Sequence, residues 1–271
     1  MHGACRGADA GPSGGGIVST DLPDIDLPAL LKRLHLPTIR RLLPGYCEQA
    51  AAEGWSHHDF LARLVAEEVA NRNNTRIQKA ARQARFPSLK TIEQFDFTFQ
   101  SSLKRQALGP YLDPDFVGQG RNLILFGPSG TGKTHLCCAL GYKAIQHGHS
   151  AIFIRACDLI DELVAGAKDG KLRDVSDKYI GPDVLIIDEV GYLHHASTAA
   201  NVLYGIVDGR HQRRRPMLFT TNKPTAQWGD VLHDHQLAEA ILDRVLERGA
   251  VIEIRGKSYR TKHHKPPTSD A

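Results

Sequence analysis

The chain has 271 residues, of which 41% are hydrophobic and 24% are charged, a composition typical of a globular protein large enough to bury a core. No segment approaches the roughly 18 consecutive apolar residues of a membrane-spanning helix, and the N-terminal residues lack the apolar segment of a secretory signal. Five cysteines without a CxxC pair argue against a disulfide scaffold and a zinc site, and they favour a cytoplasmic protein.

Composition and periodicity predict four parts along the chain. Residues 1–25 are rich in Gly, Ala and Ser, and we expect them to be disordered. We expect residues 26–90 to form a small all-helical domain and residues 91–258 to form an α/β domain. Residues 259–271 combine Lys, His, Pro and Ser without periodicity, which predicts a flexible tail.

Helix signals define the 26–90 domain. Asp26 is a candidate N-cap and is followed by leucines at helical spacing. Ser56, with Asp59 three residues later, resembles a capping box. The sequence therefore predicts a helix that begins here and continues to Arg85.

The surplus positive charge is concentrated at the end of this helix. The formal net charge is +4, and residues 71–90 contain six basic residues and no acidic residue. Four of the six recur at intervals of four, three and three, which places them on one helical face. Such a stripe favours contact with the phosphate backbone of duplex DNA, and the alternative is a solvated helix face. The candidate DNA-binding residues are Arg72, Arg76, Lys79, Arg82 and Arg85.

Short apolar runs alternate with segments of helical length in the second half of the chain. Because each run is apolar throughout, we expect a parallel sheet covered by helices on both faces. The predicted strands are residues 122–126, 151–155, 184–187, 217–221 and 251–254. Upstream of them, Phe95, Phe97 and Phe99 alternate as in a β-strand, which predicts core packing.

A glycine-rich loop follows the first predicted strand and precedes a predicted helix. Residues 127–134 read GPSGTGKT and match the pattern GxxxxGK[ST], in which backbone N–H groups cradle the phosphates of a nucleotide. A plain glycine turn is a poor alternative in this context. We expect Lys133 to reach the β- and γ-phosphates and the Thr134 hydroxyl to bind Mg²⁺. The candidate nucleotide-binding residues are Gly127, Pro128, Ser129, Gly130, Thr131, Gly132, Lys133, Thr134 and His135.

Two further strands end in polar residues suited to phosphate hydrolysis. Asp188 and Glu189 follow four aliphatic residues. The alternative is that these acids cap the next helix, but capping would explain one carboxylate and not the pair. Asp188 can hold the water shell of Mg²⁺, and Glu189 can orient and deprotonate the attacking water. Asn222 ends another apolar strand and can donate a hydrogen bond to the γ-phosphate or to the water. The candidate catalytic residues in these motifs are Lys133, Glu189 and Asn222.

These three motifs together resemble the AAA+ ATPases in the branch of the DnaC-type helicase loaders, and more closely the IstB-like helper ATPases of insertion-sequence transposition. The resemblance extends over about residues 27–260 and includes residues 55–60, 95–99, 185–193, 227–228, 241–244 and 256–260. It implies a P-loop AAA+ core with a five-stranded parallel sheet. It implies no full helical lid, because few residues follow Ile254.

The resemblance also implies an activity. IstB-like proteins bind ATP, assemble into homo-oligomers on duplex DNA and deliver a transposase to its target. In AAA+ rings an arginine of a neighbouring subunit completes the site, and Arg244 is the candidate here, with Arg248 on the same helical face. A surface arginine paired with Asp243 or Glu247 is the alternative. We therefore expect an ATPase that is slow and stimulated by DNA or a partner, and we expect residues 95–99 to lie near the adenine.

Two other functions stay open on the sequence alone. The first is a DnaC-type loader whose partner is a replicative helicase. The second is a nucleotide-dependent adaptor that binds a protein partner and scarcely hydrolyses ATP. ATPase activity measured with and without duplex DNA separates the adaptor from both DNA-linked functions.

Overall fold

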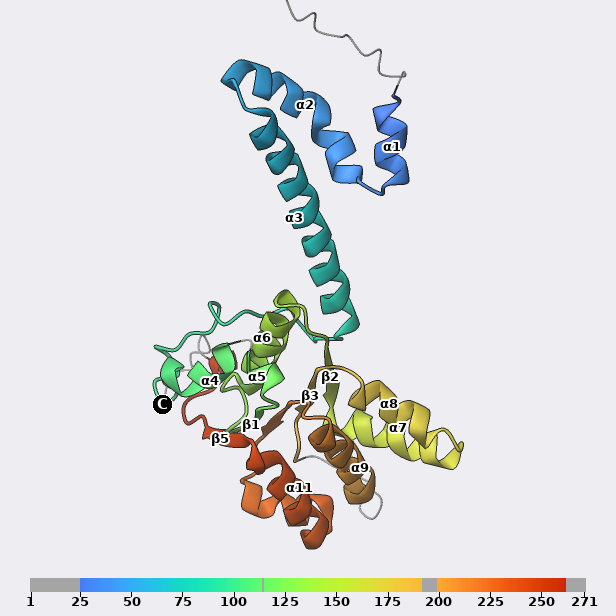
Figure 1. The fold of residues 1–271 in the computed structure, drawn as a ribbon. Coiled ribbons are helices and arrows are strands. Elements are labelled where there is room, and N and C mark those ends of the chain that lie inside the picture. Colours follow the sequence, from blue (N-terminus) through green and yellow to red (C-terminus); the bar gives the residue numbers. More distant parts are fainter. Residues whose placement is uncertain (1–24, 114, 192–198, 262–271) are drawn as a thin grey trace, which may run out of the picture. The chain divides into compact units, whose positions relative to one another are not determined.

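The computed structural model describes residues 25–113, 115–191 and 199–261 (Figure 1). Most of the predicted disordered segment and of the predicted tail therefore lies outside the described residues. Contacts between residues divide the chain into two compact units, Met1–Arg72 and Asn73–Ala271. This division falls inside a helix, upstream of the boundary at residue 90 that the sequence predicts.

Three helices form the described part of the N-terminal unit, and the third extends past Arg72 into the C-terminal unit. Asp26 caps the first helix, because its carboxylate accepts a hydrogen bond from Ala29 N at 3.0 Å. Ser56 Oγ accepts from Asp59 N at 3.1 Å and donates to the Asp59 carboxylate at 2.7 Å, which confirms the predicted helix start. The helices are α1 (Leu27–Arg33), α2 (Pro37–Glu53) and α3 (His57–Gln83).

A buried glutamate supports the small core of the N-terminal unit. Leu31, Ile39 and Leu64 form this core. Glu68 is 3% exposed, and its carboxylate accepts hydrogen bonds from the backbone N–H groups of residues 38 and 39. Arg72 donates to the same carboxylate at 3.0 Å, which balances the buried charge.

Among the described residues, five strands form one parallel sheet with the order β2-β3-β4-β1-β5. The predicted parallel sheet is confirmed, and each predicted strand lies within two residues of its observed bounds. Because all strands point the same way, the polar residues that follow them meet at one edge of the sheet. The strands are β1 (Asn122–Phe126), β2 (Ala151–Arg155), β3 (Val184–Asp188), β4 (Met217–Thr221) and β5 (Gly249–Glu253).

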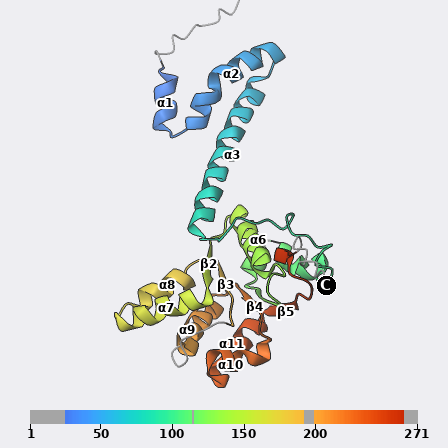
Figure 2. The ribbon, with the colours of Figure 1, turned by 180° about the vertical axis from the view of Figure 1, so that it is seen from behind.

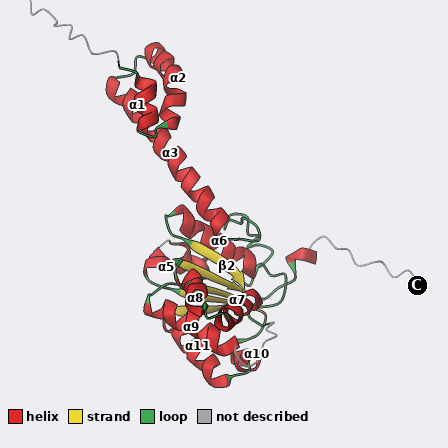
Figure 3. Cartoon of the chain, turned by 90° about the vertical axis from the view of Figure 1, so that its right-hand side faces the viewer, coloured by secondary structure: helices red, strands yellow, loops and turns green. Residues whose placement is uncertain are grey.

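Helices cover both faces of the sheet (Figures 2 and 3), and successive residues of β1 to β4 pack in two separate core clusters. One face carries η1 (Arg105–Leu108), α4 (Gly109–Leu112), α5 (Asp115–Gly118) and α6 (Lys133–Gln146). The other face carries α7 (Ala156–Lys168), α8 (Leu172–Ile180), α9 (Ala199–Gln212), α10 (Trp228–Leu232) and α11 (His235–Glu247). Two 3-10 turns, η2 (Thr225–Gln227) and η3 (Tyr259–Thr261), follow β4 and β5.

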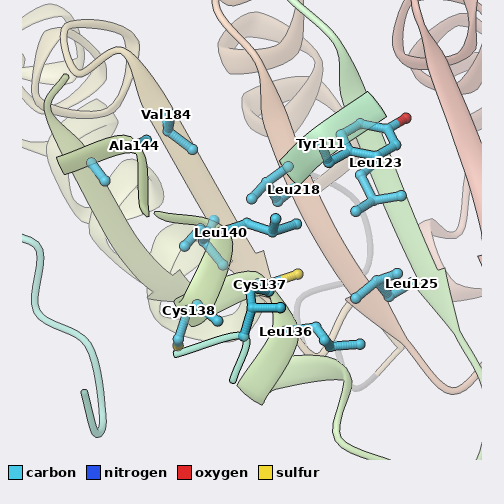
Figure 4. Packing of buried hydrophobic residues seen from close by; sticks show 14 of the residues in the cluster. Tyr111, Leu123, Leu125, Leu136, Cys137, Cys138, Leu140, Ala144, Val184 and Leu218 are labelled. Atoms are coloured by element: carbon cyan, nitrogen blue, oxygen red, sulfur yellow. The ribbon is translucent and has the colours of Figure 1, made fainter. Parts of the chain in front are cut away.

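Helix α6 is fixed by its buried side against the centre of the sheet. Leu136 and Leu140 of α6 are fully buried, together with Leu123 of β1 and Leu218 of β4 (Figure 4). This packing holds the start of α6 at the carboxyl edge of the sheet, where the glycine-rich loop lies.

The segment that contains Phe95, Phe97 and Phe99 forms bends and turns rather than a strand, although its phenylalanines alternate. The Asp96 carboxylate accepts hydrogen bonds from Thr98 N at 3.1 Å and Phe99 N at 3.0 Å, and these local bonds compete with strand pairing. Phe95 nevertheless packs in the core, as expected. Within the described part of the chain, no helix is both long and apolar enough to cross a bilayer.

Candidate nucleotide site

The glycine-rich loop, residues 127–134, joins the end of β1 to the start of α6. Gly127 has a φ of 150°, and a Cβ at this position would lie 2.1 Å from the backbone oxygen of Ile254. The close approach of these two backbones therefore requires glycine. Helix α6 begins inside the loop, so the unpaired N–H groups and the positive end of its dipole lie beside the loop's own N–H groups. Such an arrangement favours an anion, above all a phosphate.

Lys133 brings a cation into the loop. Its Nζ donates hydrogen bonds to the backbone oxygens of Gly127 and Pro128, each at 2.7 Å. Burial lowers the pKa of Lys133, and the negative charges of Asp188 and Glu189 act in the opposite direction. The ammonium group is therefore partly desolvated and close to carboxylates, which strengthens its interaction with an anionic ligand.

Asp188 connects three elements at the carboxyl edge of the sheet. It ends β3, is 5% exposed, and its Oδ1 accepts hydrogen bonds from two threonine hydroxyls. Thr134 of α6 donates at 2.8 Å, and Thr220 of β4 donates at 2.5 Å. Thr134 and Asp188, the two candidate magnesium-binding residues, thus lie in contact. Thr220 is an additional hydrogen-bond partner of Asp188.

Glu189 differs from Asp188 in its backbone conformation and in the exposure of its side chain. Its φ is 61°, a left-handed conformation that is uncommon outside glycine, and its backbone N donates to Thr220 Oγ1 at 2.9 Å. The side chain is exposed whereas that of Asp188 is buried. The backbone turn therefore separates the two carboxylates, so that one is fixed by hydrogen bonds and the other is free to contact a ligand. Strained residues of this kind cluster at functional sites.

A pocket of about 620 Å³ opens beside the loop, a volume within the range of small-molecule sites. Gly127 and Pro128 form the start of the loop and lie outside the lining. The predicted residues that line the pocket are Ser129, Gly130, Thr131, Gly132, Lys133, Thr134, His135, Asp188, Glu189 and Asn222. The structure thus gathers the candidate phosphate, metal and water-activating groups in one cavity.

One wall of this pocket is apolar and aromatic. Phe95, Cys138 and Phe153 line it, and His135 stacks edge-on against Phe95 with ring centroids 5.5 Å apart. Burial lowers the pKa of His135, which favours a neutral ring whose Nε2 lies 2.9 Å from the backbone oxygen of Thr91. An apolar wall next to a phosphate loop suits a nucleobase, and the placement of the adenine here stays a prediction.

Arg244 lies outside this pocket, on α11. Its Nε donates to Asp208 at 2.9 Å, and a terminal nitrogen donates to the Tyr204 hydroxyl at 2.7 Å. The guanidinium also lies 4.7 Å from the centre of the Tyr204 ring. Its partner is thus neither Asp243 nor Glu247, the alternatives weighed on the sequence. Arg248 donates to Glu247 at 2.9 Å. A role in a neighbouring subunit's site stays a prediction for Arg244.

The candidate DNA-binding residues divide into two groups. Arg76, Lys79, Arg82 and Arg85 are exposed residues of the C-terminal unit. In the same stretch Ile77 and Ala80 pack against the core of that unit, so the helix has an apolar side and a basic side. Arg72 instead belongs to the N-terminal unit, where it bonds to Glu68.

Several residues of the pocket were not predicted from the sequence, and Thr220, Arg155 and Arg260 are three of them. Thr220 lies inside an apolar strand, and only its position two residues before Asn222 could have suggested it. Arg155 ends β2, directly opposite Asp188 in the strand register, but no motif includes it. Arg260 lies in the 256–260 stretch, which the resemblance includes without assigning it a role.

Comparison with known proteins places the chain in a family. The profile of the family described as "IstB-like ATP binding protein" matches residues 29–266. The chain is 34% identical over 233 residues to a protein of insertion sequence IS5376 from Geobacillus stearothermophilus, and the match covers 86% of this chain and 92% of that protein. It is 35% identical over 240 residues to a protein of insertion sequence IS21 from Pseudomonas aeruginosa, with coverages of 89% and 90%.

The chain belongs to the family of IstB-like ATP-binding proteins. Solved structures agree on the fold of this family member. AMPPCP-bound DnaA from Aquifex aeolicus matches with a TM-score of 0.53 and 21% identity, over 63% of this chain and 51% of that chain. DnaI matches with the same TM-score and 21% identity, over 66% and 94%. The predicted P-loop AAA+ fold, preceded by a helical region, is confirmed.

Proposed function

We propose that this IstB-like protein binds ATP with Mg²⁺, hydrolyses it slowly, assembles on duplex DNA and recruits or activates a transposase. The observation that carries the ATPase part is the convergence of Thr134 and Thr220 on Asp188, with Lys133 in the adjoining loop and Glu189 exposed beside them. Phosphoryl transfer depends mainly on positioning and charge, and this site supplies both.

Each residue has a defined part in this proposal. The loop N–H groups and Lys133 bind the β- and γ-phosphates. Glu189 accepts a proton from the water that attacks the γ-phosphorus, and Asn222 helps to orient this water. Thr220 holds both the Asp188 carboxylate and the backbone of Glu189. It therefore positions the proposed magnesium-binding residue and the proposed base together.

The donor set suits magnesium. The Thr134 hydroxyl of α6 and the Asp188 carboxylate at the end of β3 are hard oxygen donors 2.8 Å apart. Bound Mg²⁺ would neutralise part of the charge on the phosphates. Thr134 and Asp188 would hold it, the first directly and the second through its water shell.

The DNA and partner functions rest on family membership and on charge. The relatives from IS5376 and IS21 are described as candidate ATP-binding proteins of insertion sequences, which favours a transposase over a replicative helicase as the partner. The exposed basic side of α3 favours a polyanion. Within a homo-oligomer on DNA, Arg244 would leave Asp208 and contact the nucleotide of a neighbouring subunit.

Two variants test the ATPase proposal. Lys133→Ala removes a partly buried cation and should weaken ATP binding more than about tenfold. Glu189→Gln keeps the shape of the side chain, so it should bind ATP like the parent while turnover falls at least about 100-fold. Fluorescence titration with labelled ATP and release of phosphate measure the two effects.

Lys168→Ala is a matched control, because it removes one exposed lysine distant in sequence from every motif. It should change neither binding nor turnover. Undiminished ATP affinity in Lys133→Ala would refute the loop assignment, and normal turnover in Glu189→Gln would remove this residue from the reaction.

A further inference from the structure

The residues that precede the five strands form the amino edge of the sheet, opposite the edge that carries the nucleotide pocket. Arg121 precedes β1, and residues 213–215, all arginine, precede the neighbouring strand β4. The two segments are in contact, because a Cβ on Gly120 would lie 2.7 Å from the backbone oxygen of Arg214. The pairing of β1 with β4 therefore brings together arginines that are far apart in the sequence.

Within the described ranges, three of these arginines have no acidic partner. Arg213 and Arg214 are exposed, and no hydrogen bond or ion pair of the described residues engages their side chains. Arg121 is also exposed, and its guanidinium donates to the neutral amide of Gln119. These three residues, which we name the edge arginines, can thus pair with an anion from outside the chain.

Two carboxylates at the same edge are bonded to other groups. Asp183 precedes β3, and its carboxylate accepts hydrogen bonds from Ser150 N and Ser150 Oγ, each at 2.8 Å. Glu247 lies two residues before β5 and accepts a hydrogen bond from Arg248 at 2.9 Å. Neither carboxylate is bonded to an edge arginine, so the amino edge keeps an excess of positive charge.

A buried cation behind the edge adds to this excess. Arg210 is fully buried, and its guanidinium is bonded to backbone oxygens rather than to a carboxylate. Burial is the main cause of its lowered pKa, and the positive charges of Arg215 and Arg213 lower it further. A polyanion along the edge would stabilise these neighbouring charges together.

The positive charge of the amino edge continues to the basic side of α3. A Cβ on Gly148, which precedes β2, would lie 3.5 Å from the guanidinium of Arg76. In the sheet order three strand spacings separate β2 from β1, which amounts to about 14 Å. The phosphates of one DNA strand recur about every 3.4 Å along the duplex axis, so cations spread over this length match several consecutive phosphates rather than one small anion.

We propose that the edge arginines form a second contact surface for the phosphate backbone of duplex DNA, which continues from Arg76, Lys79 and Arg82 of α3. This inference rests on the proposed function, in which the chain assembles on duplex DNA. Because the amino edge is remote from the nucleotide pocket, DNA bound there and ATP do not compete within one subunit.

The test measures DNA binding and ATP binding by one variant of the full-length chain, in which Arg121, Arg213 and Arg214 are replaced by Ala. In ATP and Mg²⁺, its affinity for a fluorescently labelled duplex should fall about tenfold or more at moderate salt. The slope of log affinity against log salt concentration should fall by about 3, because three phosphate contacts are lost. ATP affinity should equal that of the parent, since strands about 16 Å long separate the two edges, and this result shows that the variant is folded.

Arg213→Glu is a second variant that leaves Arg214 unchanged, whose φ of 52° makes this position sensitive to replacement. Reversal of one unpaired charge should weaken DNA binding about threefold or more and leave ATP binding unchanged. The matched control replaces Lys168, Lys171 and Arg173 by Ala, which removes the same charge as the triple variant from exposed positions on α7 and α8. The control should lose much less DNA affinity than the triple variant.

DNA affinity that is unchanged in both edge variants, or a loss no larger than in the control, would overturn the role of the edge arginines. In that case the parent still binds duplex DNA, and the proposed function is unaffected. If instead the parent chain itself does not bind duplex DNA, the proposed function fails, and this outcome is separate from any effect at the amino edge.

Discussion

Arg210 of α9 is a fully buried arginine that none of the sequence motifs includes. Its guanidinium donates hydrogen bonds to four backbone oxygens at 2.7 to 2.9 Å, those of Tyr179, Pro182, Asp183 and Pro216. Burial lowers its pKa to about 9, so the group stays charged at neutral pH. These bonds hold the segment before β3 against the start of β4, the two strands that carry Asp188 and Thr220.

Removing this cation should destabilise the C-terminal unit. Arg210→Met keeps much of the side-chain volume but leaves four backbone oxygens without their donor, and we expect a loss of about 3–5 kcal/mol in the free energy of unfolding. Urea unfolding followed by the fluorescence of buried Trp228, with Trp55 replaced by Phe, measures the change. Arg213→Met, at an exposed position, is the control and should change stability by less than about 0.5 kcal/mol. Similar stabilities for the two variants would contradict this account.

At the scale of single elements, the strands were predictable because each is apolar throughout and bounded by turn residues. The 95–99 segment was not, since alternation of phenylalanines looks like a strand while the Asp96 carboxylate bonds its own downstream backbone. The glycine-rich loop, Asp188 and Glu189 were predictable because their chemistry sets their spacing. Arg155 and Arg260 were not, because only the packing of the sheet and of residues 255–260 brings them to the pocket.

Asn122, at the start of β1, links three elements and gives an element-scale prediction. It is 3% exposed, its Nδ2 donates to Val245 O at 2.9 Å, and its Oδ1 accepts from Met217 N at 2.8 Å. Asn122→Ala removes the bonds of β1 to α11 and β4 and leaves two buried backbone groups unpaired, so we expect a loss of about 2–4 kcal/mol.

The same urea experiment measures this loss, with Gln119→Ala as the control because Gln119 is an exposed residue just before the strand. A loss below about 1 kcal/mol for Asn122→Ala would mean that water or repacking satisfies Val245 O and Met217 N, and the linking role would be refuted.

At the scale of the whole molecule, the basic residues of α3 belong to two different structural settings. Arg72 balances a buried glutamate in the N-terminal unit, so its replacement would alter stability as well as charge. Arg76, Lys79 and Arg82 lie in the C-terminal unit, where the apolar side of the same stretch packs on the core. A test of DNA binding therefore uses these three residues and leaves Arg72 in place.

We expect the triple variant Arg76→Ala, Lys79→Ala, Arg82→Ala to bind duplex DNA about tenfold or more weakly at moderate salt, and almost uniformly across sequences, because backbone contacts carry no sequence information. Three lost phosphate contacts should also reduce the slope of log affinity against log salt concentration by about 3. Fluorescence anisotropy with labelled duplexes, in ATP and Mg²⁺ between 50 and 200 mM salt, measures both effects.

The control variant replaces Lys168, Lys171 and Arg173 by Ala, which removes the same charge from exposed positions at the end of α7 and the start of α8. If the control loses as much affinity as the triple variant, net charge alone explains binding, and if neither loses affinity, the DNA contacts lie on other residues.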